Sequence, residues 1–436
     1  AGPAGAASCR FLAEAGHEPV VFETGNAWGG IWAPEPTNKV VYRGLVTNIP
    51  TVAMQSFDLD FPAGSPSYVK ASGLGSYLAT YAEHFGLSRF VHFGARVCHV
   101  RPLWAEGEEE VQAQRRGEAT WRLQWQAAEA NDEVEVQAED FDAVVVASGH
   151  YDTPFMPEVP GQAAWLEAAP AAGSRTVAHA QEYNDPGYYA SRAVLVVGGR
   201  SSAVDIAREL RGTARWVYVL EKGCEQVRNV GTCTHVPFGT VLGTDGHLSF
   251  GGEAIPGAPV DDVMLATGYR YRFPFLDEDE LGIDCGPMRR YVSPLYMHVV
   301  HARRPSLCFL GMPLAVPCPI PLFEAQARFA ASQLSWPPEE RSQAQRETWV
   351  AARLAEVGDR PQDMHFLSGN SWAYMRELVQ MAGMEGAAYE AYCRRLSLVK
   401  AVYDDRVAKK PELPWDDDWY RRCEYSVDWE AGTWRV

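Results

Sequence analysis

The chain alternates short apolar runs with longer amphipathic segments, which is the pattern of an α/β protein with buried parallel strands. Residues 4–15 carry apolar side chains on one helical face, and Gly16 follows as a helix-ending glycine. The apolar run at 19–23 predicts a strand that ends in an acidic residue. Further strands are predicted near 90–100, 119–126, 134–149, 193–199, 216–222, 260–269 and 305–312. Helices are predicted over 75–86 and through most of the chain after residue 321.

Some segments lack this regularity. Residues 26–70 are rich in prolines and glycines, and a long irregular stretch inside a compact enzyme is more often functional than a linker. A polar, acidic insert separates the strands near 90–100 and 119–126 and predicts a surface hairpin. The proline-rich run at 154–161 predicts a domain boundary.

The first strand–turn–helix unit has the features of a dinucleotide site. Gly2 and Gly5 match the second and third glycines of GxGxxG, which let backbone N–H groups approach a pyrophosphate at a helix start. Glu23 follows at about the 20-residue spacing of an acid that binds ribose hydroxyls. The first glycine of the motif and the strand before it do not occur in the sequence. We therefore expect the chain to be a fragment that lacks the first strand of this unit.

A second unit starts at the apolar run 193–197. Gly198 and Ala203 fit the motif, whereas Arg200 stands where the second glycine belongs. Its side chain would either crowd a cofactor or pair with a phosphate. A glycine turn in each half of the chain predicts two dinucleotides, one for each unit.

The residues after this turn leave the choice of cofactor open. Ser201 and Ser202 begin the following helix, and Glu221 and Lys222 end the next strand. A glutamate at this position favours the ribose of NADH, while a lysine favours the 2′-phosphate of NADPH.

Composition excludes several function classes. The net charge of −17 argues against nucleic acid and anionic membrane as partners, and no apolar run approaches the roughly 20 residues that span a bilayer. The nine cysteines show no CxxC pair and no zinc spacing, so we expect reduced thiols, a cytoplasmic location and no metal. A disulfide reductase would need a redox cysteine pair soon after the acid, and residues 24–60 contain no cysteine.

The run Glu23-x5-Gly29-Gly30-x-Trp32 is similar to the FAD signature of flavin-containing monooxygenases. Segments similar to that family also occur at 42–50, 60–62, 66–67, 147–161, 266–276, 292–300, 309–329 and 372–375. We therefore expect a member of this family, nearest to its yeast and plant-type branch, from residue 1 to about residue 420. The family fingerprint F-x-G-x3-H-x3-Y/F is incomplete, because Gly173 and Arg175 precede the matching His179 and Tyr183.

The resemblance implies an α/β fold with two Rossmann-like domains, in which the NADPH domain is inserted into the FAD domain. We expect the FAD domain at 1–160 and 256–436, with a helical C-terminus, and the NADPH domain at 161–255. The strand at 260–269 is expected to bring the chain back across the first sheet. A homodimer is left open.

The resemblance also implies the chemistry. NADPH would reduce FAD, oxygen would form a C4a-hydroperoxyflavin, and a soft nitrogen or sulfur atom of a small molecule would be oxygenated. Asn48 is the candidate catalytic residue that hydrogen-bonds NADP+ and the oxygen intermediate, although its place before Ile49-Pro50 alone indicates a turn. The candidates for cofactor binding are Gly2, Gly5, Glu23, Gly29, Gly30, Trp32, Thr47, Asn48, Gly198, Ser201, Ser202, Lys222, Thr267 and Gly268. Trp28 and Trp32 are expected to wall the flavin pocket, and His179 to pack the NADPH domain.

Two alternatives stay open at this point. Arg200 and the incomplete fingerprint favour an NAD(P)H oxidase that makes hydrogen peroxide, because NADP+ would be held loosely. The missing first strand favours a non-catalytic remnant that keeps the fold and binds no flavin.

Overall fold

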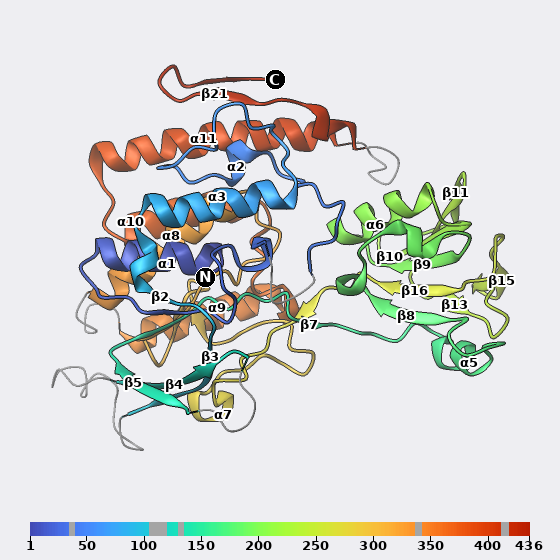
Figure 1. The fold of residues 1–436 in the computed structure, drawn as a ribbon, viewed down its shortest axis with the longest axis horizontal. Helices are drawn as coiled ribbons and strands as arrows, with labels where there is room; N and C mark the ends of the chain where they lie inside the picture. The colour runs from blue at the N-terminus through green and yellow to red at the C-terminus, as the bar shows by residue number, and fades with distance from the viewer. Residues whose placement is uncertain (35–39, 104–119, 130–134, 336–341, 411–417) are drawn as a thin grey trace.

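The computed structural model describes residues 1–34, 40–103, 120–129, 135–335, 342–410 and 418–436. Within these residues the chain forms two α/β units side by side (Figure 1). The larger unit carries both termini and most of the helices, and the smaller unit is built from the middle of the chain. The predicted hairpin of the polar insert falls at 104–119, outside the described residues.

The smaller unit is organised around a six-stranded sheet in the order β11-β12-β10-β9-β16-β8. Its strands are β8 (Thr176–His179), β9 (Ala193–Val197), β10 (Trp216–Glu221), β11 (Arg228–Val230), β12 (Cys233–Pro237) and β16 (Asp262–Leu265). All neighbours pair in parallel except β11 with β12. Every side chain of β9 is buried, so its sequence is a continuous apolar run. Helix α6 (Ser201–Arg211) follows β9, and its first turn lies at the sheet edge where such folds bind ligands.

The strand predicted at 260–269 does not join the first sheet, so that expectation is wrong. β16 pairs with β8 and β9 in the smaller unit. Asp262 anchors it there, because its carboxylate accepts hydrogen bonds from Arg192 at 2.5 and 2.7 Å and from the Thr176 hydroxyl at 2.6 Å. The sheet thus continues past the expected boundary at residue 255, and the limits of the folding units stay a prediction.

The sheet of the larger unit is in two pieces. Strands β1 (Val21–Phe22) and β2 (Val91–His92) pair in parallel. The second piece has the order β18-β19-β20-β6, with β6 (Val144–Val146), β18 (Leu295–Tyr296), β19 (Val300–His301) and β20 (Leu307–Phe309). Among the described residues no ladder joins β1 to β6, and both strands line the cavity described below. The upstream strand expected for this unit stays a prediction.

Helices cover the larger unit (Figure 1). Helix α1 (Pro3–Glu14) packs against α8 (Pro319–Ser335), and Arg10 donates a hydrogen bond to Glu324 across this contact at 3.0 Å. Ser56 and Tyr81 donate to the same carboxylate at 2.7 and 2.9 Å. Burial raises the pKa of Glu324, although Arg10 and these donors oppose the shift. The network holds α1 against α8 and α3 (Ala71–His84).

The remaining elements complete the two units. The larger unit also contains α2 (Thr51–Met54), β3 (Ala95–Pro102), β4 (Trp121–Ala127), β5 (Gln137–Phe141), α7 (Glu278–Leu281), α9 (Gln343–Val357), α10 (Ser371–Met381), α11 (Gly386–Lys409), β21 (Ser426–Asp428) and β22 (Thr433–Arg435). The smaller unit adds α5 (Gln162–Glu167), β13 (Val241–Leu242), β14 (Leu248–Phe250) and β15 (Glu253–Ala254). Short 3-10 turns lie at 30–32, 87–90, 180–182, 186–189, 361–363, 368–370 and 419–422.

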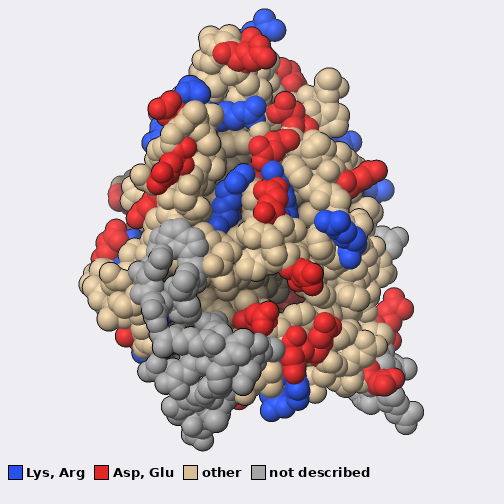
Figure 2. All heavy atoms as spheres, turned by 90° about the vertical axis from the view of Figure 1, so that its left-hand side faces the viewer, with Lys and Arg blue, Asp and Glu red and all other residues tan. Residues whose placement is uncertain are grey.

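The chain passes between the units twice. Strands β7 (Thr153–Pro154) and β17 (Tyr269–Arg270) pair antiparallel at this crossing (Figure 1). We call β7 and β17 the hinge strands. None of the described helices is long and apolar enough to cross a membrane. On the face shown in Figure 2, acidic and basic side chains are interspersed over the described residues.

Candidate functional site

A large cavity lies between the two units and is lined by residues of both. Its volume is about 3030 Å³, whereas a pocket for one drug-sized ligand measures roughly 300–1,000 Å³. The cavity therefore has room for more than one large ligand. It reaches from the start of α1 to the start of α6 and also extends between β1 and β6.

The first glycine turn lets two backbone segments cross closely. Gly30 has a φ of +57°, and a Cβ placed on it would lie 2.8 Å from the Cα of Gly2. Gly2 is the N-cap of α1, and Pro3 is its first residue, so the first-turn N–H groups that follow have no partner within the helix. A crossing of bare backbone at a helix start is the kind of surface that a pyrophosphate needs. The residues present thus fit the pyrophosphate of FAD.

Most of the first-unit candidates line this part of the cavity, namely Gly2, Gly5, Glu23, Gly30 and Trp32. Gly29 is not on the lining, and its φ of +127° shapes the turn from behind. Trp28 is also absent from the lining and lies in a hydrophobic cluster with an exposure of 7%. The expectation that Trp28 walls the flavin pocket is therefore wrong, because its ring packs edge-on against Phe93 instead.

Glu23 lies at the end of β1 and lines the cavity. Its carboxylate accepts a hydrogen bond from the Gly25 N–H at 2.7 Å. A carboxylate at this position can also accept hydrogen bonds from hydroxyl groups of a ligand.

The second glycine turn is equally tight but carries charge. Gly198 has a φ of +142°, and a Cβ on it would lie 2.4 Å from the Ala266 carbonyl oxygen. Arg200 is the N-cap of α6, and Ser201 and Ser202 are its first residues. All three side chains are exposed and line the cavity. This turn therefore offers hydroxyl groups and a guanidinium where the first turn offers bare backbone.

Glu221 and Lys222, at the end of β10, lie in different environments. The Glu221 carboxylate contacts Nδ1 of the buried His235 at 3.1 Å. The Lys222 amino group lies 5.6 Å from the centre of the Phe238 ring and makes no ion pair among the described residues. Both residues line the cavity, and the lysine is the one left to meet an anion.

Asn48 connects the two units. Its Nδ2 donates a hydrogen bond to the Ser201 hydroxyl at 2.9 Å, across the cavity they both line. Thr47 is turned into the fold, where its hydroxyl accepts a hydrogen bond from the Val69 N–H at 3.2 Å. The structure thus places Asn48 between the candidate flavin side and the start of α6.

The candidates Thr267 and Gly268 lie directly before the hinge strand β17. The Thr267 hydroxyl donates to the Phe155 carbonyl at 2.5 Å, so it is occupied by the fold. Gly268 has a φ of +83°, and its carbonyl contacts Nε2 of His179 at 3.0 Å. Nδ1 of His179 accepts the Gln181 N–H at 3.2 Å, and burial lowers the pKa of this histidine. His179 is therefore a packing residue in this arrangement.

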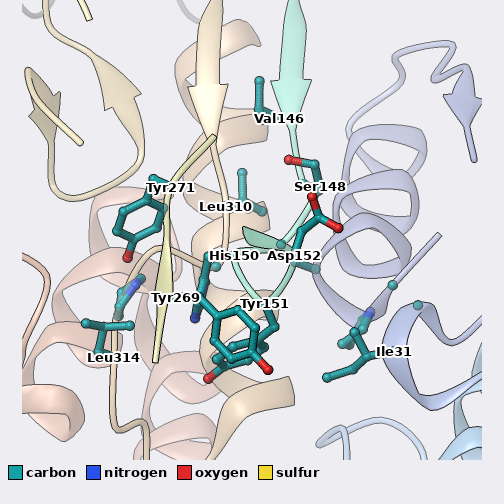
Figure 3. Close-up of a pocket in the computed structure, with 18 of the residues that line it drawn as sticks. Ile31, Val146, Ser148, His150, Tyr151, Asp152, Tyr269, Tyr271, Leu310 and Leu314 are labelled. Atoms are coloured by element: carbon teal, nitrogen blue, oxygen red, sulfur yellow. The ribbon is translucent and has the colours of Figure 1, made fainter. Parts of the chain in front are cut away.

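Sequence reasoning missed an aromatic group on the lining. His150 lies 4.3 Å from Tyr151 and 5.5 Å from Tyr271 between ring centres, and Tyr151 lies 5.3 Å from Tyr269 (Figure 3). Within the described residues, neither nitrogen of His150 has a hydrogen-bond partner of ordinary geometry, and burial lowers its pKa to about 4. The sequence GHYD at 149–152 resembles the family, but nothing in it predicted that these rings would gather on the cavity.

A buried ion pair also fixes the smaller unit against the C-terminal segment. Nη2 of Arg421 donates to both carboxylate oxygens of Asp205 on α6, at 3.1 and 2.9 Å. The side chains are only 8% and 10% exposed. Arg208 adds a hydrogen bond to Asp205 at 2.6 Å. The orientation of α6 relative to the cavity therefore depends on a residue near the end of the chain.

Known proteins resemble this chain in sequence and in fold. The family model described as flavin-binding monooxygenase-like matches residues 1–244, more than half of the chain. The Arabidopsis thaliana protein "flavin-containing monooxygenase FMO GS-OX-like 2" is 32% identical over 368 residues, which cover 77% of this chain and 72% of that one.

Solved structures agree with this relationship. S-allyl-L-cysteine S-oxygenase from Allium sativum is 26% identical, with a TM-score of 0.76 over 96% of this chain and 95% of that one. Tmm from Pelagibacter sp. strain HTCC7211 is 21% identical and shares the fold, with a TM-score of 0.73 over 100% of this chain and 94% of that one. The expected family and the α/β fold class with two Rossmann-like units are confirmed. The chain belongs to the flavin-containing monooxygenase family of enzymes.

Proposed function

We propose that the protein binds FAD and NADPH and oxygenates a soft sulfur or nitrogen atom of a small molecule at the expense of O2. One observation carries the proposal. Two glycine turns at helix starts face one cavity of about 3030 Å³, and Asn48 of one unit hydrogen-bonds Ser201 of the other between them. This arrangement supports two dinucleotides whose reactive ends meet beside Asn48.

FAD belongs with the first turn. The start of α1 with Gly2 and Gly5 would hold its pyrophosphate, Glu23 its ribose, and Trp32 would wall the cavity near its ring. When bound, FAD would accept hydride from NADPH and activate oxygen. NADPH belongs with the second turn, where Ser201 and the start of α6 offer hydrogen bonds to phosphate.

Asn48 is the residue that we assign to the reaction centre. Its amide offers both a donor and an acceptor and carries no proton that titrates near neutral pH. With Nδ2 turned to Ser201, the amide is held in a fixed orientation at the junction of the units. It would thereby keep the nicotinamide half of the cofactor in place and help to exclude water.

The contact between the units supports the exclusion of water. Tyr42, from the same loop as Asn48, packs into the core of the smaller unit against Tyr183, at 5.4 Å between ring centres. The hydroxyl of Tyr183 donates to Glu209 at 2.8 Å. A loop anchored in this way holds Asn48 at one side of the cavity.

Sulfur is the atom that we favour. The Allium sativum protein, which is 26% identical over 96% of this chain, is an S-allyl-L-cysteine S-oxygenase. The aromatic group around His150 offers rings to the cavity, and a thioether sulfur makes favourable contacts with aromatic rings.

The test compares Asn48→Ala with the wild-type protein. We expect the variant to keep its FAD content and its reduction by NADPH, while sulfoxide formed per NADPH falls at least tenfold, about 1.4 kcal/mol in the oxygenation step. Hydrogen peroxide should rise to match the lost sulfoxide. The control is Asn184→Ala, because Asn184 lies at the same contact between the units but does not line the cavity.

The outcomes separate the alternatives. Unchanged sulfoxide per NADPH in Asn48→Ala would remove Asn48 from the reaction centre. Stoichiometric peroxide from the wild-type protein would show an NAD(P)H oxidase. A folded protein that takes up no FAD would show a non-catalytic remnant.

A further inference from the structure

Three arginine side chains near the hinge strands have no acidic partner among the described residues. The guanidinium carbons of Arg270 and Arg290 lie 5.2 and 4.9 Å from the centre of the Phe155 ring. The guanidinium of Arg200 lies 5.1 Å from the centre of the Phe366 ring. None of the three appears in an ion pair of the described chain, although the net charge of the protein is −17.

Three arginines elsewhere in the described chain have carboxylate partners. Arg10 binds three of them, Arg192 binds Asp262 through two hydrogen bonds, and Arg421 binds Asp205 in the same way. An enclosed guanidinium without an anion bears an uncompensated desolvation cost. Arg270 and Arg290 are half-buried and Arg200 is exposed, so an anion bound in the cavity would supply the partner that these three arginines lack.

The protein contacts of these arginines leave most of their donors free. Among the described residues, Arg290 donates only to the Thr267 carbonyl, at 3.2 Å. The Nε of Arg270 is buried and has no hydrogen-bond partner in the described part of the chain. Burial lowers the pKa of Arg290, and the charges of Arg200 and Arg270 lower it further, while Tyr271 and, more weakly, Asp363 oppose the shift. Asp363 itself pairs with Arg360 at 3.3 Å.

Arg200 and Arg290 are open to a ligand. Both line the cavity, together with Phe155, Thr267 and Phe366, whereas Arg270 lies behind the lining. The planar fork of a guanidinium binds carboxylate and phosphate oxygens in pairs, and stacking on an aromatic ring holds the fork in place. Both arginines are therefore held ready for an oxyanion.

We propose that Arg200 and Arg290 form an oxyanion subsite on the cavity between the units, with Arg270 adding charge from behind Phe155. The subsite rests on the proposed function, because the two sources of such a group are a phosphate of the dinucleotide and a carboxylate of the thioether substrate. In the second case the natural substrates are anionic thioethers, such as S-substituted amino acids.

Equilibrium titrations of the FAD-loaded protein test the proposal without turnover. The variants are Arg290→Gln and Arg200→Gln, and Arg215→Gln is the control. Arg215→Gln removes the same charge from the unit that carries Arg200, but Arg215 pairs with Asp261 at the opposite end of β10 from the cavity. The probes are NADP+, S-methyl-L-cysteine and S-methyl-L-cysteinamide, of which only the last lacks an anionic group.

Each result has a defined meaning. If the subsite holds a phosphate, the dissociation constant of NADP+ rises at least tenfold in both variants and both thioethers bind unchanged. If it holds a carboxylate, S-methyl-L-cysteine weakens at least tenfold while its amide and NADP+ do not. Changes below twofold for all three probes, or equal changes in Arg215→Gln, would overturn the proposal.

Two further measurements keep the test separate from the proposed function. FAD content and the thermal midpoint show whether each variant is folded. If Arg290→Gln does not fold, Arg290→Lys, which keeps the charge but lacks the planar guanidinium, takes its place. A wild-type protein that binds these probes but forms no sulfoxide would contradict the oxygenase proposal, and the titrations would still decide the subsite.

Discussion

The two glycine turns face the same cavity but are built differently. At the first, Gly2 and Gly30 cross so closely that a single Cβ would lie 2.8 Å from backbone, and the sheet beneath is in two pieces. At the second, Arg200, Ser201 and Ser202 open α6 above a continuous six-stranded sheet. The first turn depends on close backbone approach, and the second offers charge and hydroxyl groups.

This difference predicts which substitutions should weaken ligand binding at each site. A change of volume should damage either site, because a Cβ on Gly30 or on Gly198 would meet backbone at 2.8 or 2.4 Å. A change of charge should damage the second site most, because its side chains are exposed and the sheet below is complete. The predictions that follow test this division, starting from the largest effect.

Gly30→Ala should abolish FAD binding. The new Cβ would meet the Cα of Gly2 at 2.8 Å, and the φ of +57° adds strain of about 1 kcal/mol or more. Gly64→Ala is the matched control, because its φ is +82° and nothing lies within 4 Å of the added Cβ. FAD content per chain and the NADP+ dissociation constant are the measurements. Equal flavin loss in both variants would mean that backbone conformation, and not the crossing, is decisive.

Acid should destabilise the larger unit first. Burial lowers the pKa of His150 to about 4 and those of His301 and His365 to about 3, whereas an unfolded histidine titrates near 6.5. Below pH 6.5 the unfolded chain therefore binds protons that the folded chain excludes. The free energy of unfolding should be flat above that pH and fall by up to about 1.4 kcal/mol per pH unit for each histidine below it.

Urea unfolding curves at pH 7.5 and 5.5, monitored through the release of flavin, measure this loss of unfolding free energy. His301→Asn should reduce it by about 1 kcal/mol, since an amide oxygen can still accept the Arg303 and Arg304 N–H groups that now donate to Nδ1 at 3.3 and 3.0 Å. His247→Asn is the control, because that side chain is 50% exposed. An unchanged pH slope in His301→Asn would contradict this account.

The ion pair between Asp205 and Arg421 should show how far the second turn depends on the larger unit. Arg421→Met leaves the buried carboxylate with Arg208 alone, so we expect a loss of about 1–2 kcal/mol in unfolding free energy. The dissociation constant of NADP+ should rise, because α6 carries Ser201 to Asn48. The double variant Asp205→Asn/Arg421→Met completes a mutant cycle, and strict additivity would show that the two residues are not coupled.

The sequence was informative where a signal is local. Glycine turns, helical periodicity and the apolar run of β9 predicted both helix starts, and Asn48 lies beside the second of them. Membership of a sheet is not local. The strand at 262–265 has the same apolar character wherever it pairs, so the pattern could not place it between β8 and β9.

Neither the burial of a side chain nor its partner in space could be predicted from the sequence. Trp28 and Trp32 are four residues apart, but only the second lines the cavity. Asp205 and Arg421 are separated by 216 positions, and no spacing rule connects them. Arg290 belongs to no motif, and what distinguishes it is that it lies over the Phe155 ring without an ion pair among the described residues, which no run of letters records.

Lys222→Gln should give the smallest effect and decide the cofactor. Glu221 is engaged by His235 at 3.1 Å, which leaves the exposed Lys222 to meet a 2′-phosphate. The pair would be solvent-exposed, so we expect KM for NADPH to rise about fivefold, near 1 kcal/mol, while KM for NADH stays the same. Phe238→Leu is the control, because it removes the ring beside the lysine but keeps the charge. Equal changes for NADH and NADPH would mean that Lys222 does not distinguish them, and that the second turn selects its cofactor by shape, as the first one does.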